Sequence, residues 1–300
     1  MLGRDPGVTA AARRTPGPGP YAAGVTTTPS EEPGLPGPYA ARLGLTGAPG
    51  ADLDGLRAMQ RAHIRAIPFE NLDPVRGVVP SLEPADIEAK LVRGGRGGYC
   101  HEHDILFSHM LTRVGFGVTE LGARVVRGAA DPAARPRTHM ALLVDVPGER
   151  TPYLADVGFG ERFGLLEPVP LVVDREFEGA GRRHRLVHAP HRGPLPLWVL
   201  QAWEDGAWRG QYAFTLDPFE RSDFAAANWF VATNPRSPFA RRPYVQRSFP
   251  DGGHLSLVDH LLTRTDLNGA RTEREIPEGG LVPVLTGEFG LTLPADFALA

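Results

Sequence analysis

The sequence predicts an α+β protein in which helices come first, strands follow and a mixed segment ends the chain. Apolar side chains recur at helical spacing in residues 53–67 and again in residues 100–114. In residues 118–214, short β-branched and aromatic runs are separated by proline and glycine, which indicates an antiparallel sheet or barrel. A helix-prone stretch at residues 223–231 then leads into the mixed final segment.

Proline and glycine set the limits of the helices expected in the first third. The apolar face of residues 53–67 ends at Pro68, because proline cannot continue a helix. A second helix is expected over residues 83–92, and the glycine-rich run 94–98 interrupts the chain after it. The third helix starts at residue 100 and closes at Gly115, a typical helix-ending residue.

The first 38 residues differ in composition from the rest of the chain. They are crowded with proline and glycine and show no apolar periodicity, so we expect residues 1–38 to form a disordered tail. We interpret this tail as a dispensable extension, with a proline-rich docking motif as the alternative.

Composition excludes several classes of protein. The net charge of −3 leaves no basic excess for binding a nucleic acid backbone. No run of about 18 apolar residues predicts a membrane helix, and a single cysteine cannot form an internal disulfide. We therefore expect a cytoplasmic protein with no nucleic acid or membrane partner. Lys90 is the only lysine among 32 basic residues, which we interpret as nucleotide composition bias.

The single cysteine, Cys100, stands where a reactive thiol is expected. It follows a glycine-rich loop and begins a predicted helix, whose unpaired N–H groups and dipole favour an anion and lower the pKa of a thiol. The alternative is an inert, buried cysteine. A metal site is not expected, although His101, Glu102, His103 and Asp104 follow directly, because a helix turns consecutive side chains to different faces.

A predicted hairpin supplies a candidate base and a residue to orient it. Residues 138–146 read as one strand, Pro147 to Arg150 as the turn, and residues 151–157 as the returning strand. With a two-residue loop His139 opposes Asp156, and with a four-residue loop Asp156 lies one diagonal step from His139 on the same face. A three-residue loop would place them on opposite faces. Either of the first two registers predicts a Cys100, His139 and Asp156 constellation.

From about Leu53 to Phe297 the chain resembles the arylamine N-acetyltransferases. The resemblance is carried by an ordered set of motifs, which are Ile67-Pro68-Phe69-Glu70-Asn71-Leu72, Arg96-Gly97-Gly98-Tyr99-Cys100-His101-Glu102, Thr138-His139 and Asp156-Val157-Gly158-Phe159-Gly160. Further on, residues 223–230 and 234–239 are similar to the interdomain helix of that family and the loop after it.

The resemblance implies a domain layout. It places a helical bundle with the catalytic cysteine at residues 39–117, a β-barrel with the histidine and aspartate at 118–220, and an interdomain helix with an α/β lid at 221–300. It also implies a papain-like triad of Cys100, His139 and Asp156.

The resemblance further assigns residues around the triad. Arg96 and Glu70 should form a buried structural ion pair. Phe159 and Gly160 should line the amine pocket, where ordinary barrel packing is the alternative for Phe159. Thr138 should touch the pantetheine of the donor.

The activity implied is acetyl transfer from acetyl-CoA to small aromatic amines or hydrazines through an acetyl-cysteine intermediate with ping-pong kinetics. Acetyl-CoA acts as the donor, and no permanently bound cofactor or metal is expected. The main alternative is an amide synthase of the same fold, which would release a polyketide as a macrolactam. Two further rival functions are a papain-like hydrolase and a noncatalytic binding protein.

One residue departs from the pattern of the family. Asn commonly stands four residues after the cysteine, and this chain has Asp104 there. A second carboxylate beside the sulfur is expected to raise the pKa of the thiol.

Overall fold

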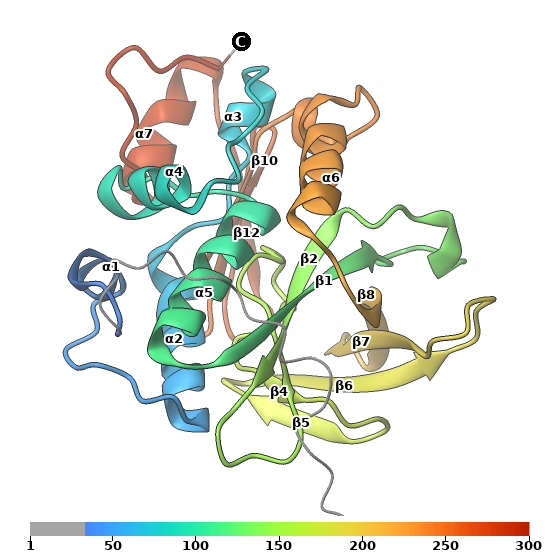
Figure 1. Ribbon diagram of the computed structural model, residues 1–300. Coiled ribbons are helices and arrows are strands. Elements are labelled where there is room, and N and C mark those ends of the chain that lie inside the picture. The colour runs from blue at the N-terminus through green and yellow to red at the C-terminus, as the bar shows by residue number, and fades with distance from the viewer. Residues whose placement is uncertain (1–33, 300) are drawn as a thin grey trace, which may run out of the picture. The chain divides into compact units, whose positions relative to one another are not determined.

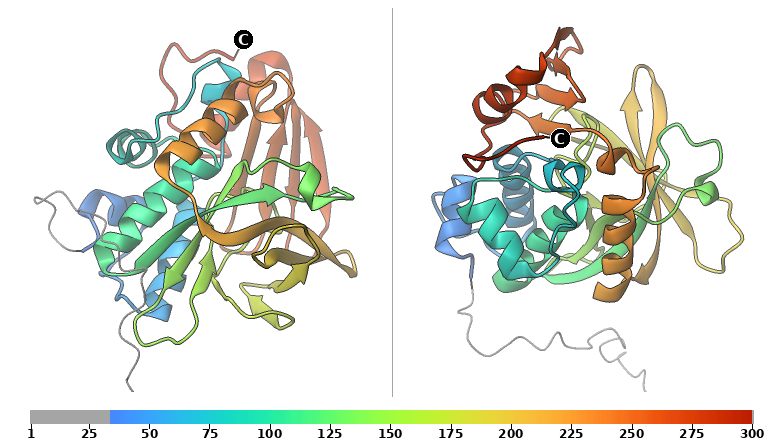
Figure 2. Two further views of the ribbon diagram at one scale, coloured as in Figure 1. Left: turned by 45° about the vertical axis from the view of Figure 1, so that its right-hand side comes forward. Right: turned by 90° about the horizontal axis from the view of Figure 1, so that it is seen from above.

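The computed structural model describes residues 34–299, and Figures 1 and 2 show how their elements are arranged. The helices of the first part of the chain are α1 (Gly37–Leu43), α2 (Leu53–Ala66), α3 (Leu72–Val75), α4 (Pro84–Glu88) with a π-helical turn η1 (Ala89–Arg93), and α5 (Cys100–Val114). Helix α5 packs against the strands β1 (Gly117–Val125) and β2 (His139–Asp145) and against α4 (Figure 1). The helices predicted at residues 53–67 and 100–114 are therefore present.

Helix α1 corrects the limit of the expected tail. It begins at Gly37, within residues 1–38, while residues 1–33 lie outside the described part of the chain. Pro38 stands in the first turn of α1, where a missing N–H removes no helical hydrogen bond. Tyr39 and Leu43 are buried one turn apart, so the packing of this apolar pair accounts for a helix beside so many prolines.

An eight-stranded antiparallel sheet follows α5 and curls into a nearly closed, barrel-like form (Figure 1). Its strands lie in the order β4-β3-β2-β1-β8-β7-β6-β5. They are β1 (Gly117–Val125), β2 (His139–Asp145), β3 (Tyr153–Ala155), β4 (Val169–Pro170), β5 (Glu176–Gly179), β6 (Arg182–Ala189), β7 (Leu197–Glu204) and β8 (Ala207–Pro218). A short 3-10 turn η2 (Pro132–Ala134) lies in the loop between β1 and β2.

The sequence allowed two registers for the hairpin β2–β3, one with a two-residue loop and one with a four-residue loop. Leu142 pairs with Ala155 and Leu143 with Leu154, which is the register expected for the four-residue turn. Strand β3 ends at Ala155, so Asp156 follows directly on the face that His139 shares.

The last part of the chain is mixed, as predicted. Helix α6 (Arg221–Thr233) and the 3-10 turn η3 (Pro238–Ala240) lead to a separate four-stranded antiparallel sheet in the order β12-β11-β10-β9 (Figure 2). Its strands are β9 (Tyr244–Ser248), β10 (His254–Val258), β11 (Leu261–Thr265) and β12 (Arg271–Glu275), followed by η4 (Glu278–Gly280) and α7 (Leu281–Gly287). Among the described residues, no helix has the length and apolar character needed to cross a bilayer.

The apolar core brings the first helices onto the sheet. Leu56 and Met59 of α2 and Leu106 and Met110 of α5 form one buried cluster with Met140 of β2. This packing holds the start of α5, which is Cys100, against the start of β2, which is His139.

Candidate active site

Cys100 is the first residue of α5 and is 6% exposed. The preceding Tyr99 N–H donates to the Glu102 Oε2 atom over 3.1 Å, which closes the helix start as a capping box. The sulfur lies 3.6 Å from the Thr138 carbonyl oxygen. The backbone N–H groups of His101 and Met140 also face the sulfur.

His139 therefore lies between two residues whose backbone atoms touch the Cys100 sulfur. Its Nε2 atom is 2.9 Å from the Asp156 Oδ2 atom, and both side chains are buried. The other oxygen of Asp156, Oδ1, accepts the Gly158 N–H over 2.9 Å. Because Nε2 is bound to the carboxylate, the remaining ring nitrogen, Nδ1, is left for proton exchange. The three residues singled out in the sequence come together in one place.

Two aromatic rings pack on the His139 imidazole. The ring centroid of Tyr212 lies 4.8 Å away and that of Phe159 lies 5.2 Å away. Burial raises the pKa of Tyr212 well above its ordinary value, and the adjacent Asp156 carboxylate raises this pKa further. Tyr212 could not be singled out from the sequence, because a tyrosine in a strand of the barrel carries no local signal for its proximity to Asp156.

The surroundings of the sulfur do not lower the pKa of the Cys100 thiol, contrary to what the helix start alone had led us to expect. Burial raises the pKa of the Cys100 thiol above its ordinary value, and the carboxyls of Asp104 and Asp156 raise it further. The N–H groups of His101 and Met140 lower this pKa but do not overcome the burial. The start of α5 alone therefore does not ionise the thiol, and a proton acceptor is needed.

Asp104 is fully buried, and its carboxyl lies near Cys100 and Asp156. Its Oδ1 atom accepts the Val157 N–H over 3.0 Å, and its Oδ2 atom has no hydrogen-bond partner among the described residues. Burial raises the pKa of Asp104 well above its ordinary value, and the nearby Asp156 raises it further. Asp104 therefore loses its proton at a higher pH than an ordinary carboxyl does.

Gly158 allows the close approach of the segment after β3 to α5. A Cβ atom at this position would lie 2.5 Å from the Asp104 Oδ2 atom and 2.7 Å from the Cys100 Cα atom. Real Cβ atoms do not approach other atoms so closely, so any other residue at position 158 would push Asp156 away from the cysteine.

A buried ion network supports the start of α5. The expected contact between Arg96 and Glu70 is present, with 2.9 Å between Arg96 Nε and Glu70 Oε1. Arg96 Nη2 also lies 3.0 Å from Asp73 Oδ1. Lys90 Nζ lies 2.6 Å from the second oxygen of Asp73 and 2.7 Å from Glu102 Oε1. The sequence analysis gave Lys90 no role, and the structure places it in ion-pair contact with the carboxylate that caps the cysteine.

The polar residues after Cys100 turn to different faces of α5. The His101 ring packs against Tyr99 and Phe224, whereas His103 Nδ1 lies 2.9 Å from His63 Nε2. Within residues 34–299, no group of three or more histidine, cysteine or acidic side chains is arranged to hold a metal ion.

Thr138 lies against the cysteine and Phe159 against the histidine, whereas Gly160 lies against Phe69. The Thr138 carbonyl contacts the sulfur, and Phe159 is 9% exposed beside the His139 ring. Gly160 has a φ of +73°, and a Cβ atom there would lie 2.6 Å from the Phe69 ring. These residues can contribute to a substrate site only at its wall, because most of their surface is packed.

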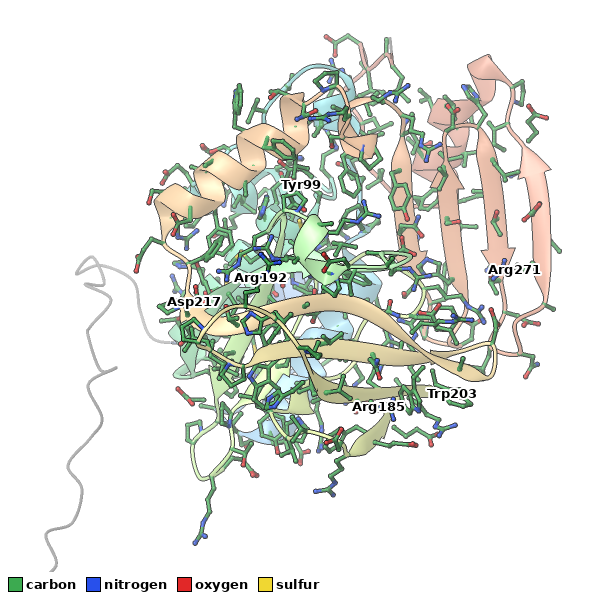
Figure 3. All side chains as sticks on the ribbon, turned by 90° about the vertical axis from the view of Figure 1, so that its right-hand side faces the viewer. Tyr99, Arg185, Arg192, Trp203, Asp217 and Arg271 are labelled. Atoms are coloured by element: carbon green, nitrogen blue, oxygen red, sulfur yellow. The ribbon has the colours of Figure 1, made fainter. Side chains whose placement is uncertain are left out.

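A surface groove of about 920 Å³ extends from the chain just before Thr138. Its charged lining includes Arg124, Arg137 and Arg192 together with Asp131 and Asp217. Figure 3 labels two residues of this groove, Arg192 and Asp217, and also Tyr99, which precedes the cysteine. Arg137 is paired with Asp217 over 2.9 Å, so Arg124 and Arg192 leave the groove with a positive surplus.

A family model described as N-acetyltransferase matches residues 52–298, which defines the class of protein as an acyl-transferring enzyme. The chain is 42% identical over 202 residues to the arylamine N-acetyltransferase of Mycolicibacterium smegmatis, covering 66% of this chain and 70% of that protein. The crystal structure of Nocardia farcinica arylamine N-acetyltransferase matches with a TM-score of 0.79 at 38% identity, covering 86% of this chain and 89% of that one.

A third match is the Mycobacterium marinum arylamine N-acetyltransferase in complex with CoA. Its TM-score is 0.77 at 33% identity, covering 85% of this chain and 92% of that one. The chain belongs to the arylamine N-acetyltransferase family.

Proposed function

We propose that the protein transfers the acetyl group of acetyl-CoA to aromatic amines or hydrazines through an acetyl-cysteine at Cys100. The observation that carries this proposal is the buried pair of His139 and Asp156 at 2.9 Å, with the backbone on both sides of His139 in contact with the sulfur. Family membership supports acetyl-CoA as the donor, and the existence of a relative solved with CoA agrees with it.

In the first half-reaction the sulfur of Cys100 attacks the carbonyl carbon of the thioester. The thiol proton passes to His139 Nδ1, and the Asp156 carboxylate stabilises the imidazolium through Nε2. The N–H groups of His101 and Met140 face the sulfur and favour the negative charge that develops there. The carbon–sulfur bond to CoA then breaks, and His139 returns the proton to the CoA thiolate, which leaves as a thiol.

In the second half-reaction the amine nitrogen attacks the carbonyl carbon of the acetyl-cysteine. His139 accepts one proton from the nitrogen, the bond between carbon and Cys100 breaks, and the proton returns to the sulfur. The products are the N-acetylated amine and the free thiol, so the enzyme is restored without any oxidant or reductant.

The packing around His139 suits an intermediate that water would destroy. The rings of Tyr212 and Phe159 cover the imidazole, and both residues are at least nine-tenths buried. A buried acetyl thioester is protected from hydrolysis until the amine enters. Phe159 and Gly160 would form the wall of the amine pocket.

The groove beside Thr138 suits the donor. Two of its arginines, Arg124 and Arg192, can pair with the phosphates of CoA, while the pantetheine reaches the sulfur past the Thr138 carbonyl. We further propose the layout of a helical domain over residues 39–117, a barrel domain over 118–220, and a helix with a lid domain over 221–300. Because α1 begins at Gly37, the first domain includes residues 37 and 38.

Steady-state kinetics and one substitution test the proposal together. Initial rates with acetyl-CoA and an arylamine should give parallel double-reciprocal lines, as a ping-pong mechanism requires. Asp156→Asn should lower kcat by about 10²–10⁴-fold, because an amide holds the wrong imidazole tautomer and cannot stabilise the imidazolium. Intersecting lines, or an Asp156→Asn variant with unchanged kcat, would contradict the mechanism.

A further inference from the structure

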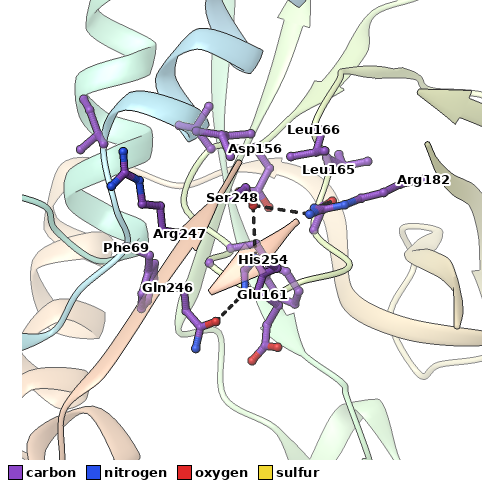
Figure 4. A pocket seen from close by; sticks show the side chains of 16 residues that line it. Phe69, Asp156, Glu161, Leu165, Leu166, Arg182, Gln246, Arg247, Ser248 and His254 are labelled. Carbon is purple, nitrogen blue, oxygen red and sulfur yellow. Dashed lines mark hydrogen bonds between the residues drawn. The ribbon is translucent and has the colours of Figure 1, made fainter. Parts of the chain in front are cut away.

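A small cavity lies where the segment after β3, the strand β6 and the strands β9 and β10 meet (Figure 4). Its volume is about 30 Å³, and its polar lining includes Arg182, Ser248 and His254. A water molecule needs about 10–15 Å³ on this measure, so the cavity has room for two waters or for one small ion. The cavity is not lined by Cys100 or His139, but Asp156 forms part of its wall.

The Arg182 guanidinium points into this cavity without an acidic partner. Its Nη1 atom donates to the Gly164 carbonyl over 2.8 Å, and its Nη2 atom makes a long contact of 3.4 Å to the Ser248 oxygen (Figure 4). Within residues 34–299, no carboxylate lies within ion-pair distance of Arg182. The cavity's two carboxylates form hydrogen bonds with other residues, Asp156 with His139 and Glu161 with the Tyr244 hydroxyl. A second guanidinium, that of Arg247, also lines the cavity.

The other polar groups of the cavity do not neutralise this charge. His254 Nε2 lies 2.6 Å from Gln246 Oε1, and because a carbonyl oxygen only accepts, the proton of the ring is on Nε2. His254 Nδ1 is then an acceptor for the Ser248 hydroxyl at 3.3 Å, which leaves the Ser248 oxygen to accept from Arg182. Ser248 and His254 therefore form a neutral chain behind the guanidinium.

Partial burial of a charge that has no ion-pair partner is costly. Burial lowers the pKa of Arg182 to about 9, and the neighbouring Arg162 adds to this effect. An arginine retained in such a place is stabilised if a mobile anion enters the cavity and pairs with it, since a buried charge becomes tolerable once it is paired and hydrogen-bonded.

We propose that this cavity is a binding site for one small monovalent anion, a halide or a formate-sized carboxylate, held by the Arg182 guanidinium. The anion would pair with Arg182, whose hydrogen bonds reach Gly164 in the segment after β3 and Ser248 at the end of β9. Occupancy would therefore tie the segment that begins with Asp156 to both sheets. The cavity borders the proposed amine pocket, because Phe159 and Gly160 line it as well, but neither Cys100 nor His139 does.

Thermal unfolding with added anions tests the site. Sodium bromide and sodium formate are titrated in separate series, and the ionic strength is held constant with sodium gluconate, whose anion is too large for the cavity. The wild-type protein should show a saturable rise in Tm of about 2–4 °C in each series. The matched control Arg175→Met, which removes an exposed arginine elsewhere on the barrel, should retain the rise, and Arg182→Met should lose it.

Crystals of the wild-type protein grown in sodium bromide provide a measurement that needs no variant. Anomalous diffraction should place a bromide ion in the cavity next to the Arg182 guanidinium. The proposal is overturned if saturating bromide leaves the cavity without an anomalous peak, or if Arg182→Met shows the same saturable rise in Tm as the wild type. A rise with bromide but not with formate would restrict the site to halides and contradict its carboxylate specificity.

Discussion

Asp104 is the residue whose chemistry separates this chain most clearly from the pattern of its family. Its carboxyl lies beside the sulfur of Cys100 with one oxygen unpartnered among the described residues. Once this carboxyl is ionised, its negative charge raises the pKa of the thiol. Asp104→Asn keeps the size and the acceptor for the Val157 N–H but removes that charge.

We therefore predict that Asp104→Asn lowers the apparent pKa of Cys100, because the thiolate no longer forms beside a second carboxyl. The measurement is the rate of alkylation by iodoacetamide as a function of pH, with Cys100→Ala as the blank. A pH profile identical to that of the wild type would show that Asp104 does not act on the thiol.

Phe159 is the residue expected to select the amine. Its ring packs edge-on against His139, and its replacement by the smaller leucine opens space next to the imidazole. Phe159→Leu should change the ratio of kcat/KM between a small and a bulky arylamine by about tenfold.

The matched control for Phe159 is Phe177→Leu, since Phe177 packs against the same barrel cluster without touching His139. If both variants keep the wild-type ratio, Phe159 has only a packing role.

At the scale of elements, the start of α5 depends on a charge from the helix before it. Lys90 of η1 pairs with Glu102, which accepts the N–H of Tyr99 immediately before the cysteine. Burial raises the pKa of Glu102 to about 7, and Lys90 opposes this shift together with the Tyr99 N–H.

Lys90→Met should therefore leave Glu102 and Asp73 without this cation and lower the free energy of unfolding by about 3 kcal/mol. Urea denaturation measures the change. Lys90→Arg is the control, because it retains the charge, and adding Glu102→Gln to Lys90→Met should recover part of the loss. A Lys90→Met protein as stable as the wild type would mean that the network adds nothing to the folded state.

Some of the helices and strands could be predicted from the sequence, and others could not. The helix from Cys100 to Val114 and the hairpin with His139 and Asp156 followed from periodicity and turn chemistry, and the structure has both. Helix α1 was missed, because two prolines and a glycine outweighed the single buried pair of Tyr39 and Leu43. That pair stabilises a helix only when α2 is present to cover it, which is tertiary information.

At the scale of the whole molecule, buried histidines set the dependence of stability on pH. Burial lowers the pKa of five of them, to about 3 for His101 and His254, to about 4 for His103 and His184, and well below its ordinary value for His63. The unfolded chain binds these protons near pH 6.5, and the folded protein does not. Their contribution to stability is therefore complete above about pH 6.5 and is lost as the pH falls.

Three acids act in the opposite direction. Glu102, Asp104 and Glu120 have raised pKa values, so on acidification the folded protein binds their protons before the unfolded chain does. Since five histidines outweigh three acids, Tm should fall steadily from pH 6.5 to pH 4.5, with each unmatched proton contributing about 1.4 kcal/mol per pH unit. Scanning calorimetry across this range checks the sign, and a Tm that stays constant or rises would contradict it.

The site illustrates what the sequence alone could and could not reach. Cys100, His139 and Asp156 were found because each stands at a recognisable local position, and the contact between Arg96 and Glu70 followed from family resemblance. Tyr212, Lys90 and Arg182 were not found, since their roles depend on neighbours more than 10 residues away along the chain. The effect of Asp104 on the pKa of Cys100 was expected, but the larger effect of burial was missed, because burial cannot be read from a helix terminus.

The central claim is that Cys100 carries the acetyl group, and intact mass spectrometry tests it most directly. The purified protein and Cys100→Ala are each mixed with acetyl-CoA, and an arylamine is then added. We predict a single acetyl adduct on the cysteine-containing protein alone, which disappears as the N-acetylated amine is formed. Formation of the acetylated amine by Cys100→Ala at the wild-type rate, or the absence of any adduct on the wild-type protein, would contradict the account.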